Sequence, residues 1–366
     1  MAEKNIEKSL VYVGTYSQSE NESIFLYGLN NSTGELNFIK SFGGGKKPSY
    51  MVFDKSYEYL YAVNETENYA GKKSGAACAF SVDRPSGFIS LLNRVTSEGQ
   101  SPANIAISED GRVILIANYK TGSVAVFPVE KSGILGKASD VIQHEGSGPD
   151  LERQSSAHTH FIIFSPDSRF VFAVDLGMDK IFSYHLNKNN GNQKLTNQAT
   201  AFNSRPGTGP RQMCFHPNKK YAYLIHELKS TVAALSYDNE KGLFTEMQTI
   251  ATIPENFSGE NNCGGIKISE DGKYLYGSNR GHDSIVVFAV DGDNGRLSYV
   301  ENVPSGGMWP REFTIDPKGN FLLAANQHSD NIASFKIDKT SGRLTNTGHH
   351  VQVEKPAFVQ VVPRFE

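Results

Sequence analysis

The sequence predicts an all-β protein, a seven-bladed β-propeller with four strands in each blade. Three observations predict this fold. Short runs rich in Val, Ile, Phe and Tyr alternate with Asp-Gly, Pro-Asn and Ser-Gly turns, and helical periodicity is nearly absent. One pattern returns about every 50 residues, a period that is typical of propeller blades. Finally, half of the last repeat stands at the N-terminus, as a closed ring requires.

The first strand of each repeat is predicted at an apolar run that ends in a tight turn. The last apolar residues of these runs are Phe53, Ile107, Phe164, Phe215, Ile268, Ile315 and Val361. The second strand is predicted at a run that ends eleven residues later. Its polar last residues are Asn64, Asn118, Asp175, His226, Asn279 and Asn326, and Thr15 takes the same place in the N-terminal "VYVGTY".

The outer two strands of a blade are predicted at runs such as "SVAVFPVE" (123–130) and "GILGKASD" (133–140). The ring is expected to close by pairing of an N-terminal strand with the C-terminal blade, because closure removes an exposed sheet edge. Residues 10–366 are therefore interpreted as one propeller domain, and residues 1–9 as a loose N-terminal segment. A tandem of β-sandwiches is the alternative, but it does not explain the half repeat at the N-terminus.

Composition narrows the class of protein. A formal net charge of −3 argues against nucleic acid or an anionic membrane as partner. Three scattered cysteines, Cys78, Cys214 and Cys263, favour a reducing compartment over a disulfide framework. We see no signal peptide and no stretch of about 18 apolar residues. The expectation is a soluble, cytoplasmic protein that is a monomer or weak homo-oligomer.

The alignment also predicts where polar residues gather. The first strand lines the channel and the second runs antiparallel to it, so the start of one and the end of the other share a face. Arg211 and Glu227 take these two places in one blade. His160, Arg280 and Arg311 take them in neighbouring blades. Several charges that converge on one concave mouth are typical of a binding or active site.

His158 and His160 occur in "SSAHTHF", where strand alternation places them on the same side. Two such histidines can bind zinc, but no third ligand is evident, so neither a metal nor a cofactor is predicted. A histidine that titrates near neutrality suits proton transfer, and a structural hydrogen bond is the other interpretation. Asn279, His282, Asn326 and Gln327 follow second runs, and together with His158 and Arg311 they are predicted to bind substrate.

Arg211, Arg280 and Arg311 form a cationic set suited to a carboxylate, a phosphate or a developing oxyanion. Structural ion pairs with Glu227, Glu65 or Glu312 are the alternative role. Glu227 is interpreted as an orienting partner rather than a base, because nearby cations favour its charged form. Arg311, or less directly Lys267, could supply a spare cation for a phosphosugar. No GxSxG nucleophile motif or phosphate-binding loop is present.

Four segments carry a resemblance to a known family: "SAHTHFIIFSPDSRFVFAVDLGMDKIFSYHL", "GPRQMCFHPNKKYAYLIHELKSTV", "KISEDGKYLYGSNRGHDSIVVFAV" and "WPREFTIDPKGNFLLAANQHSDNIASFKID". They resemble the seven-bladed propeller lactonases, which include bacterial 6-phosphogluconolactonases and fungal carboxymuconate cyclases. The resemblance runs from "VYVGTYS" to "PAFVQVVP". It implies a catalytic set of His160, Arg211, Glu227 and Arg280, with no required metal.

The function expected from this resemblance is hydrolysis of an anionic sugar lactone, namely 6-phosphogluconolactone to 6-phosphogluconate in the pentose phosphate pathway. The arginines are expected to hold the phosphate and the oxyanion, and His160 to activate water. Alternatives are a carboxymuconate cyclase, a lactonase for another substrate, or a propeller that binds a partner without catalysis. The charged mouth disfavours the last alternative, which predicts a flat or apolar face.

Overall fold

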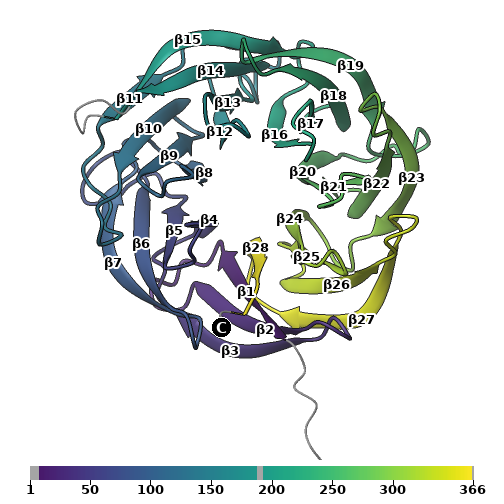
Figure 1. The fold of residues 1–366 in the computed structure, drawn as a ribbon, viewed down its shortest axis with the longest axis horizontal. Helices are drawn as coiled ribbons and strands as arrows, with labels where there is room; N and C mark the ends of the chain where they lie inside the picture. Colours follow the sequence, from purple (N-terminus) through teal and green to yellow (C-terminus); the bar gives the residue numbers. More distant parts are fainter. Residues whose placement is uncertain (1–7, 188–192, 365–366) are drawn as a thin grey trace, which may run out of the picture.

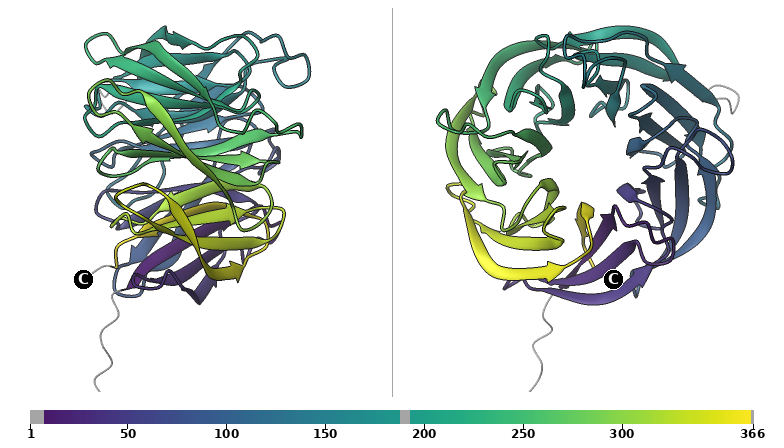
Figure 2. Two further views of the ribbon diagram at one scale, coloured as in Figure 1. Left: turned by 90° about the vertical axis from the view of Figure 1, so that its right-hand side faces the viewer. Right: turned by 180° about the vertical axis from the view of Figure 1, so that it is seen from behind.

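The computed structural model describes residues 8–187 and 193–364, which form 28 β-strands in a ring of seven four-stranded sheets (Figure 1). Figure 2 shows the same ring from behind and from the side. The innermost strands are β4 (Pro48–Phe53), β8 (Pro102–Ile107), β12 (Thr159–Phe164), β16 (Pro210–Phe215), β20 (Asn262–Ile268), β24 (Pro310–Ile315) and β28 (Pro356–Val362). The second strands are β5 (Tyr59–Asn64), β9 (Val113–Asn118), β13 (Val171–Asp175), β17 (Tyr221–His226), β21 (Tyr274–Arg280), β25 (Phe321–Asn326) and β1 (Lys8–Thr15).

The outer half of each blade is a second hairpin. The third strands are β6 (Ala76–Asp83), β10 (Ser123–Pro128), β14 (Lys180–Asn187), β18 (Thr231–Asp238), β22 (Ser284–Val290), β26 (Asn331–Ile337) and β2 (Ile24–Asn30). The outermost strands are β7 (Phe88–Thr96), β11 (Asp140–Gln143), β15 (Lys194–Asn203), β19 (Leu243–Ala251), β23 (Leu297–Pro304), β27 (Leu344–Gln352) and β3 (Leu36–Phe42). Neighbouring strands are antiparallel, as a chain of short hairpins requires.

The second strands end where the repeat predicts them, except for β21, and one predicted outermost strand is wrong. Asn64, Asn118 and Asn326 each end a second strand, whereas β21 continues one residue past its predicted end to Arg280. The run "GILGKASD" was expected to form an outermost strand, and this is wrong. A turn with Gly133 at φ 80° folds this run back into a bridge between Val129 and Leu135, so β10 pairs with residues 140–143 instead.

Neighbouring blades are joined by packed apolar faces and by a repeated buried hydrogen bond. In four blades a fully buried tyrosine lies three residues before the predicted second-strand end. Its hydroxyl donates to the carbonyl of a turn glycine in the adjacent blade. The pairs are Tyr12 with Gly87, Tyr61 with Gly133, Tyr223 with Gly295 and Tyr276 with Gly342. The glycines adopt φ of about 70–80°, which residues with a Cβ adopt only with strain. The blades are therefore held in a fixed relative arrangement.

The ring closes in the sheet β28-β1-β2-β3, where the N-terminal strand β1 pairs antiparallel with the C-terminal strand β28. Val11 opposes Val361 and Val13 opposes Val359 in this register, and all four side chains are buried. Residues 8 and 9 were expected to belong to a loose segment but lie in β1, and residues 1–7 lie outside the described part of the chain. Across the described ranges, no helix is long and apolar enough to traverse a bilayer.

Candidate active site

A charged cavity of about 340 Å³ lies at one mouth of the channel, where first strands begin and second strands end. Its lining residues are Tyr16, Glu65, Ala103, Tyr119, Arg153, His160, Glu227, Asn262, Arg280, Trp309, Arg311 and Gln327. A second cavity, of about 370 Å³, is lined mainly by apolar side chains of the inner strands together with Lys267. Of these two cavities, the first holds most of the charged side chains.

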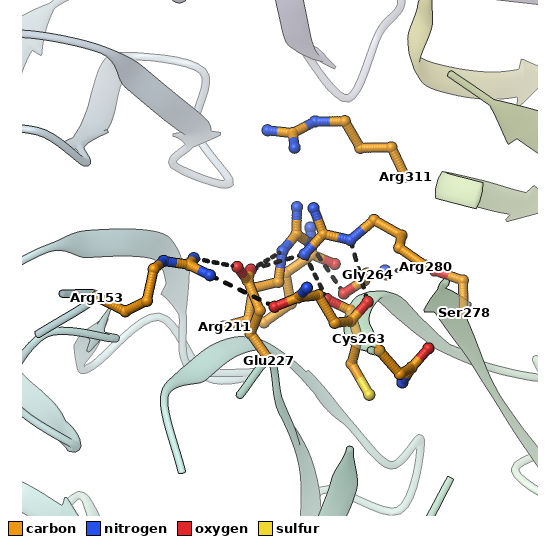
Figure 3. Close-up of polar contacts among 12 residues, drawn as sticks. Arg153, Arg211, Glu227, Cys263, Gly264, Ser278, Arg280 and Arg311 are labelled. Atoms are coloured by element: carbon orange, nitrogen blue, oxygen red, sulfur yellow. Dashed lines mark hydrogen bonds and ion pairs between the residues drawn. The ribbon is translucent and has the colours of Figure 1, made fainter. Parts of the chain in front are cut away.

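Glu227 is the centre of a cluster of three guanidinium groups (Figure 3). One carboxylate oxygen, Oε2, lies 2.9 Å from Arg211 Nε and 2.9 Å from Arg280 Nη2. The other, Oε1, accepts from Arg153 Nη2 at 2.5 Å. The backbone fixes this geometry: Glu227 N donates to Gly209 O at 2.7 Å, immediately before the inner strand that carries Arg211. Both oxygens of this carboxylate are thus occupied by cations.

Two of these arginines are also fixed by backbone carbonyl groups at the start of β20. Arg280 donates to Asn262 O at 3.2 Å and to Cys263 O at 2.8 Å, and Arg211 donates to Gly264 O at 2.9 Å. Gly264 also permits close packing of β20 against the next blade, because a Cβ there would come within 2.8 Å of two backbone oxygens of that blade. The Arg280 guanidinium also lies 5.4 Å from the centroid of the Trp309 ring, within the range of a cation–π contact.

The electrostatics of the cluster follow from burial and charge. Burial alone would raise the pKa of Glu227, but the guanidinium groups of Arg280 and Arg211 outweigh it and hold that pKa far below its usual range. Burial lowers the pKa of Arg280 to about 10, so this side chain is still cationic at neutral pH. Three cations share one anion here, which leaves an excess of positive charge for a ligand.

A second carboxylate, Glu65, faces the same cavity with fewer partners. Tyr16 donates its hydroxyl proton to Glu65 Oε2 at 2.6 Å, and Arg311 Nη2 lies 3.6 Å from that oxygen. The Arg311 guanidinium covers the Tyr16 ring at 4.7 Å from its centroid. In the described residues, no hydrogen bond or ion pair involves Glu65 Oε1. Arg311 lies apart from the Glu227 cluster (Figure 3).

The two histidines predicted for the site, His158 and His160, differ in whether they reach the cavity. Both contact Tyr119: His158 stacks on its ring and donates from Nδ1 to its carbonyl at 3.0 Å, whereas His160 meets the ring edge. Only His160 lines the cavity. Burial, and then the charge of Arg211, lower the pKa of His160 well below its usual value, so the imidazole is neutral. Its Nδ1 is buried and has no hydrogen-bond partner among the described residues.

Of the remaining residues predicted for the site, some line the cavity and others do not. Gln327 and Arg311 line the cavity, whereas Asn279, Asn326 and His282 do not. The Asn279 and Asn326 amides are buried and donate to the carbonyls of Thr252 and Ser305. These asparagines tie the second strands to the connections that lead in from the preceding blades. His282 bonds to Ser284 Oγ at 2.7 Å and packs against Phe257.

Arg211 also lies outside the cavity lining, since its side chain is only 3% exposed behind Glu227. It therefore touches the cavity through Glu227 rather than directly. For the described residues, there is no group of three His, Cys, Asp or Glu side chains that could hold a metal ion.

Three lining residues take none of the positions that the repeat alignment assigns to the mouth: Arg153, Asn262 and Trp309. Arg153 comes from the long connection between β11 and β12, which a strand alignment does not cover. Trp309 did carry a signal, because it is the one tryptophan of the chain and immediately precedes an inner strand. It has φ of 63°, and its N–H donates to Asp283 at 2.8 Å, which holds it in this strained conformation.

A ring of seven four-stranded blades with a cationic mouth defines a class of propeller proteins that includes lactonases. The chain matches the family described as "Lactonase, 7-bladed beta-propeller" over residues 10–361, and it belongs to that family. It is 36% identical to a 6-phosphogluconolactonase of Bacillus subtilis, over 85% of this chain and 86% of that protein. It is 32% identical to a 6-phosphogluconolactonase of Formosa agariphila, over 84% and 86%.

Solved structures give the same result. The periplasmic gluconolactonase PpgL of Pseudomonas aeruginosa matches with a TM-score of 0.91 and 32% identity, over 98% of this chain and 99% of that one. A Bacteroides fragilis protein described as a candidate 6-phosphogluconolactonase matches with a TM-score of 0.90 and 35% identity, over 99% and 100%. The names of these relatives thus include both a phosphorylated and an unphosphorylated lactone.

Proposed function

We propose that this protein hydrolyses an anionic sugar δ-lactone, 6-phosphogluconolactone, to 6-phosphogluconate. The observation that carries the proposal is the cluster in which three guanidinium groups share the single carboxylate of Glu227 at the mouth of the channel. Family membership and the names of the relatives support the same reaction class. An excess of fixed cations suits both a phosphate group and the oxyanion that forms when water attacks a lactone carbonyl.

Arg280 and Arg153 differ in how exposed their side chains are, and we assign them different roles. Arg280 is held by two carbonyls and Trp309, so its guanidinium is a preorganised donor for the oxyanion. Losing one such donor typically costs about 3 kcal/mol of transition-state stabilisation. The Arg153 side chain is 35% exposed at the rim and is placed to bind the phosphate, which stands on the exocyclic C6 and can extend away from the lactone ring. Arg211 and Glu227 orient Arg280 and Arg153.

Hydrolysis of gluconolactone itself is the second candidate, because PpgL is a gluconolactonase. The two substrates differ only in the phosphate group. A preference for the phosphorylated lactone would reflect cations at the rim, whereas equal rates would indicate that these cations bind no phosphate.

The test is the disappearance of 6-phosphogluconolactone, generated in situ, against its spontaneous hydrolysis. Wild-type protein is expected to accelerate the reaction, and Arg280→Ala to lose about 10²–10³-fold in kcat. Arg343→Ala is the matched control: it removes an arginine that pairs with Glu301 before the outermost strand β27 and is 56% exposed, so activity should be unchanged. No acceleration by folded wild-type protein would contradict the proposal.

We further propose a cytoplasmic monomer that acts in the pentose phosphate pathway without a cofactor. The three cysteines are free, and Cys78 and Cys263 are buried, which suits a reducing compartment. Cell fractionation and the molar mass in solution test these points directly. Recovery of the protein from the periplasm, or a stable oligomer, would contradict them.

A further inference from the structure

Hydrolysis of a lactone needs a group that accepts a proton from the attacking water. The cavity offers three side chains of the right chemistry, namely the carboxylates of Glu227 and Glu65 and the imidazole of His160. The sequence pointed to His160, and the contacts of the three groups now distinguish them. This inference rests on the proposed lactone hydrolysis and assigns a further residue to it.

Glu227 is not available as a proton acceptor. Both of its oxygens are bound by guanidinium groups, at 2.5 Å on Oε1 and twice at 2.9 Å on Oε2. A proton placed on either oxygen would break one of these charge-assisted contacts and leave three buried or half-buried cations opposite a neutral group. The role of Glu227 is to hold the arginines.

His160 is better placed to donate than to accept. Its Nδ1 is buried without a partner, so Nε2 is the nitrogen that reaches the cavity. A neutral imidazole carries one proton, and proteins leave a buried N–H without an acceptor less often than they leave a buried acceptor short of a donor. The proton is therefore retained on Nε2, where the ring can donate a hydrogen bond to the substrate carbonyl.

Glu65 has the open acceptor. Tyr16 and Arg311 both engage Oε2, whereas Oε1 forms no hydrogen bond or ion pair with the described residues, and Glu65 lines the cavity. The residue is held in place, because its N–H donates to Lys47 O at 2.9 Å directly after β5. From this geometry we infer that Glu65 is the general base for lactone hydrolysis and that His160 is a hydrogen-bond donor to the carbonyl oxygen.

The reaction balances with these two groups. Glu65 takes one proton from water as the water oxygen bonds to the carbonyl carbon. The π electron pair moves to the carbonyl oxygen, which receives hydrogen bonds from His160 and Arg280. When the carbonyl re-forms, the ring C–O bond breaks and its electron pair goes to the ring oxygen, which takes the proton from Glu65. The product is the open-chain hydroxy acid, whose carboxyl group releases its proton to solvent.

The experiment compares substitutions that keep or remove each function, with rates corrected for spontaneous hydrolysis. Glu65→Gln keeps an acceptor for the Tyr16 hydroxyl but removes the base, so kcat is expected to fall by about 10²–10⁴-fold with KM nearly unchanged. His160→Gln keeps an N–H donor and is expected to lose less than about 10-fold, whereas His160→Phe loses about 10²–10³-fold. A base at His160 predicts that Gln and Phe are equally inactive.

Binding of 6-phosphogluconate by calorimetry shows that each variant is folded with an intact cavity. If Glu65→Gln fails to fold, Glu65→Asp replaces it: this variant retains the charge but withdraws it by one methylene, and the same loss of kcat is expected. Formate should partly restore the rate of Glu65→Ala. An active wild type with kcat retained in Glu65→Gln, or an equal loss in His160→Gln and His160→Phe, overturns this assignment alone. An inactive wild type overturns the proposed function with it.

Discussion

At the scale of single residues, the guanidinium groups around Glu227 differ in how tightly the protein holds them. Arg280 and Arg211 are 5% and 3% exposed and bound to backbone carbonyls, whereas Arg153 is 35% exposed and comes from a loop. The first two have little freedom to follow a ligand. Arg153 contacts Glu227 Oε1 through Nη2 alone, so the rest of its guanidinium can meet a phosphate while both oxygens of Glu227 stay bound.

Arg153→Ala is accordingly expected to change substrate preference. One charge-assisted contact to phosphate is lost, so kcat/KM for 6-phosphogluconolactone should fall by about 10–100-fold. The same ratio for glucono-δ-lactone, which has no phosphate, should change little. Both are measured by lactone loss, with Arg343→Ala as control. Equal losses on the two substrates would show that Arg153 serves the reaction or the fold instead.

His226 gives the fold a dependence on pH. Burial first, and then the charge of Arg205, lower the pKa of His226 from 6.5 to about 4, and its Nε2 is buried without a partner among the described residues. The unfolded chain therefore binds a proton that the folded protein does not accept. Stability is fully present above about pH 6.5 and is lost as the pH falls toward 4, by roughly 3 kcal/mol in total.

We expect urea unfolding of wild-type protein to show about 2 kcal/mol less stability at about pH 5 than at about pH 7.5 from this residue alone. His226→Asn removes the titrating group, so its free energy of unfolding should fall less over the same interval. A parallel pH dependence in the two proteins would assign the effect to other groups.

At the scale of elements, one buried network places the strand that carries His160. Asp175, the last residue of β13, accepts from the N–H of His158 at 2.8 Å through one oxygen. Its other oxygen bonds to His144 Nδ1 at 2.7 Å, and His144 Nε2 bonds to the Tyr184 hydroxyl at 2.6 Å. The start of β12 is thus fixed from behind by groups that never reach the cavity.

His144→Phe would leave Asp175 and the Tyr184 hydroxyl without this partner, at a cost of about 1–3 kcal/mol for each buried group. Urea unfolding should show that loss, and kcat should fall because His160 is displaced. His216→Phe is the matched control, since His216 is buried beyond the other end of an inner strand and bonds to Gly272 O. It should lose stability but keep kcat. Equal kcat values in the two variants would contradict a positioning role for His144.

The strands were predictable and the loops were not, for a physical reason. An inner or second strand is a short apolar run that ends in a turn, so its residues are constrained in every blade, and Asn64, Asn118 and Asn326 all mark strand ends. Asn279 and Asn326 lie at or next to such ends, and their side-chain amides donate to backbone carbonyls. The sequence pattern alone does not distinguish an amide with this structural role from one that binds a ligand. Arg153 lies in a connection with no repeat counterpart, and only the fold brings it to Glu227.

At the scale of the whole molecule, the charge distribution matters more than its sum. The formal net charge is −3, yet the mouth holds three guanidinium groups around one carboxylate. An anionic substrate is therefore drawn to one face of a protein that repels it on average. Increasing NaCl from about 0.02 M to about 0.5 M should raise KM for 6-phosphogluconolactone and leave kcat nearly constant. The KM for glucono-δ-lactone is the internal control, and a parallel rise there would contradict steering by charge.

The pairing of β1 with β28 also has a consequence for synthesis of the protein. β1 ends at Thr15 and β28 begins at Pro356, so the first strand to leave the ribosome waits for the last one. At about 5–20 residues per second this delay lasts tens of seconds, during which one edge of β1 has no partner. Six blades can form before β28 has been synthesised, but the seventh cannot. The nascent ring is therefore open, and exposed to wrong partners, until β28 has been made.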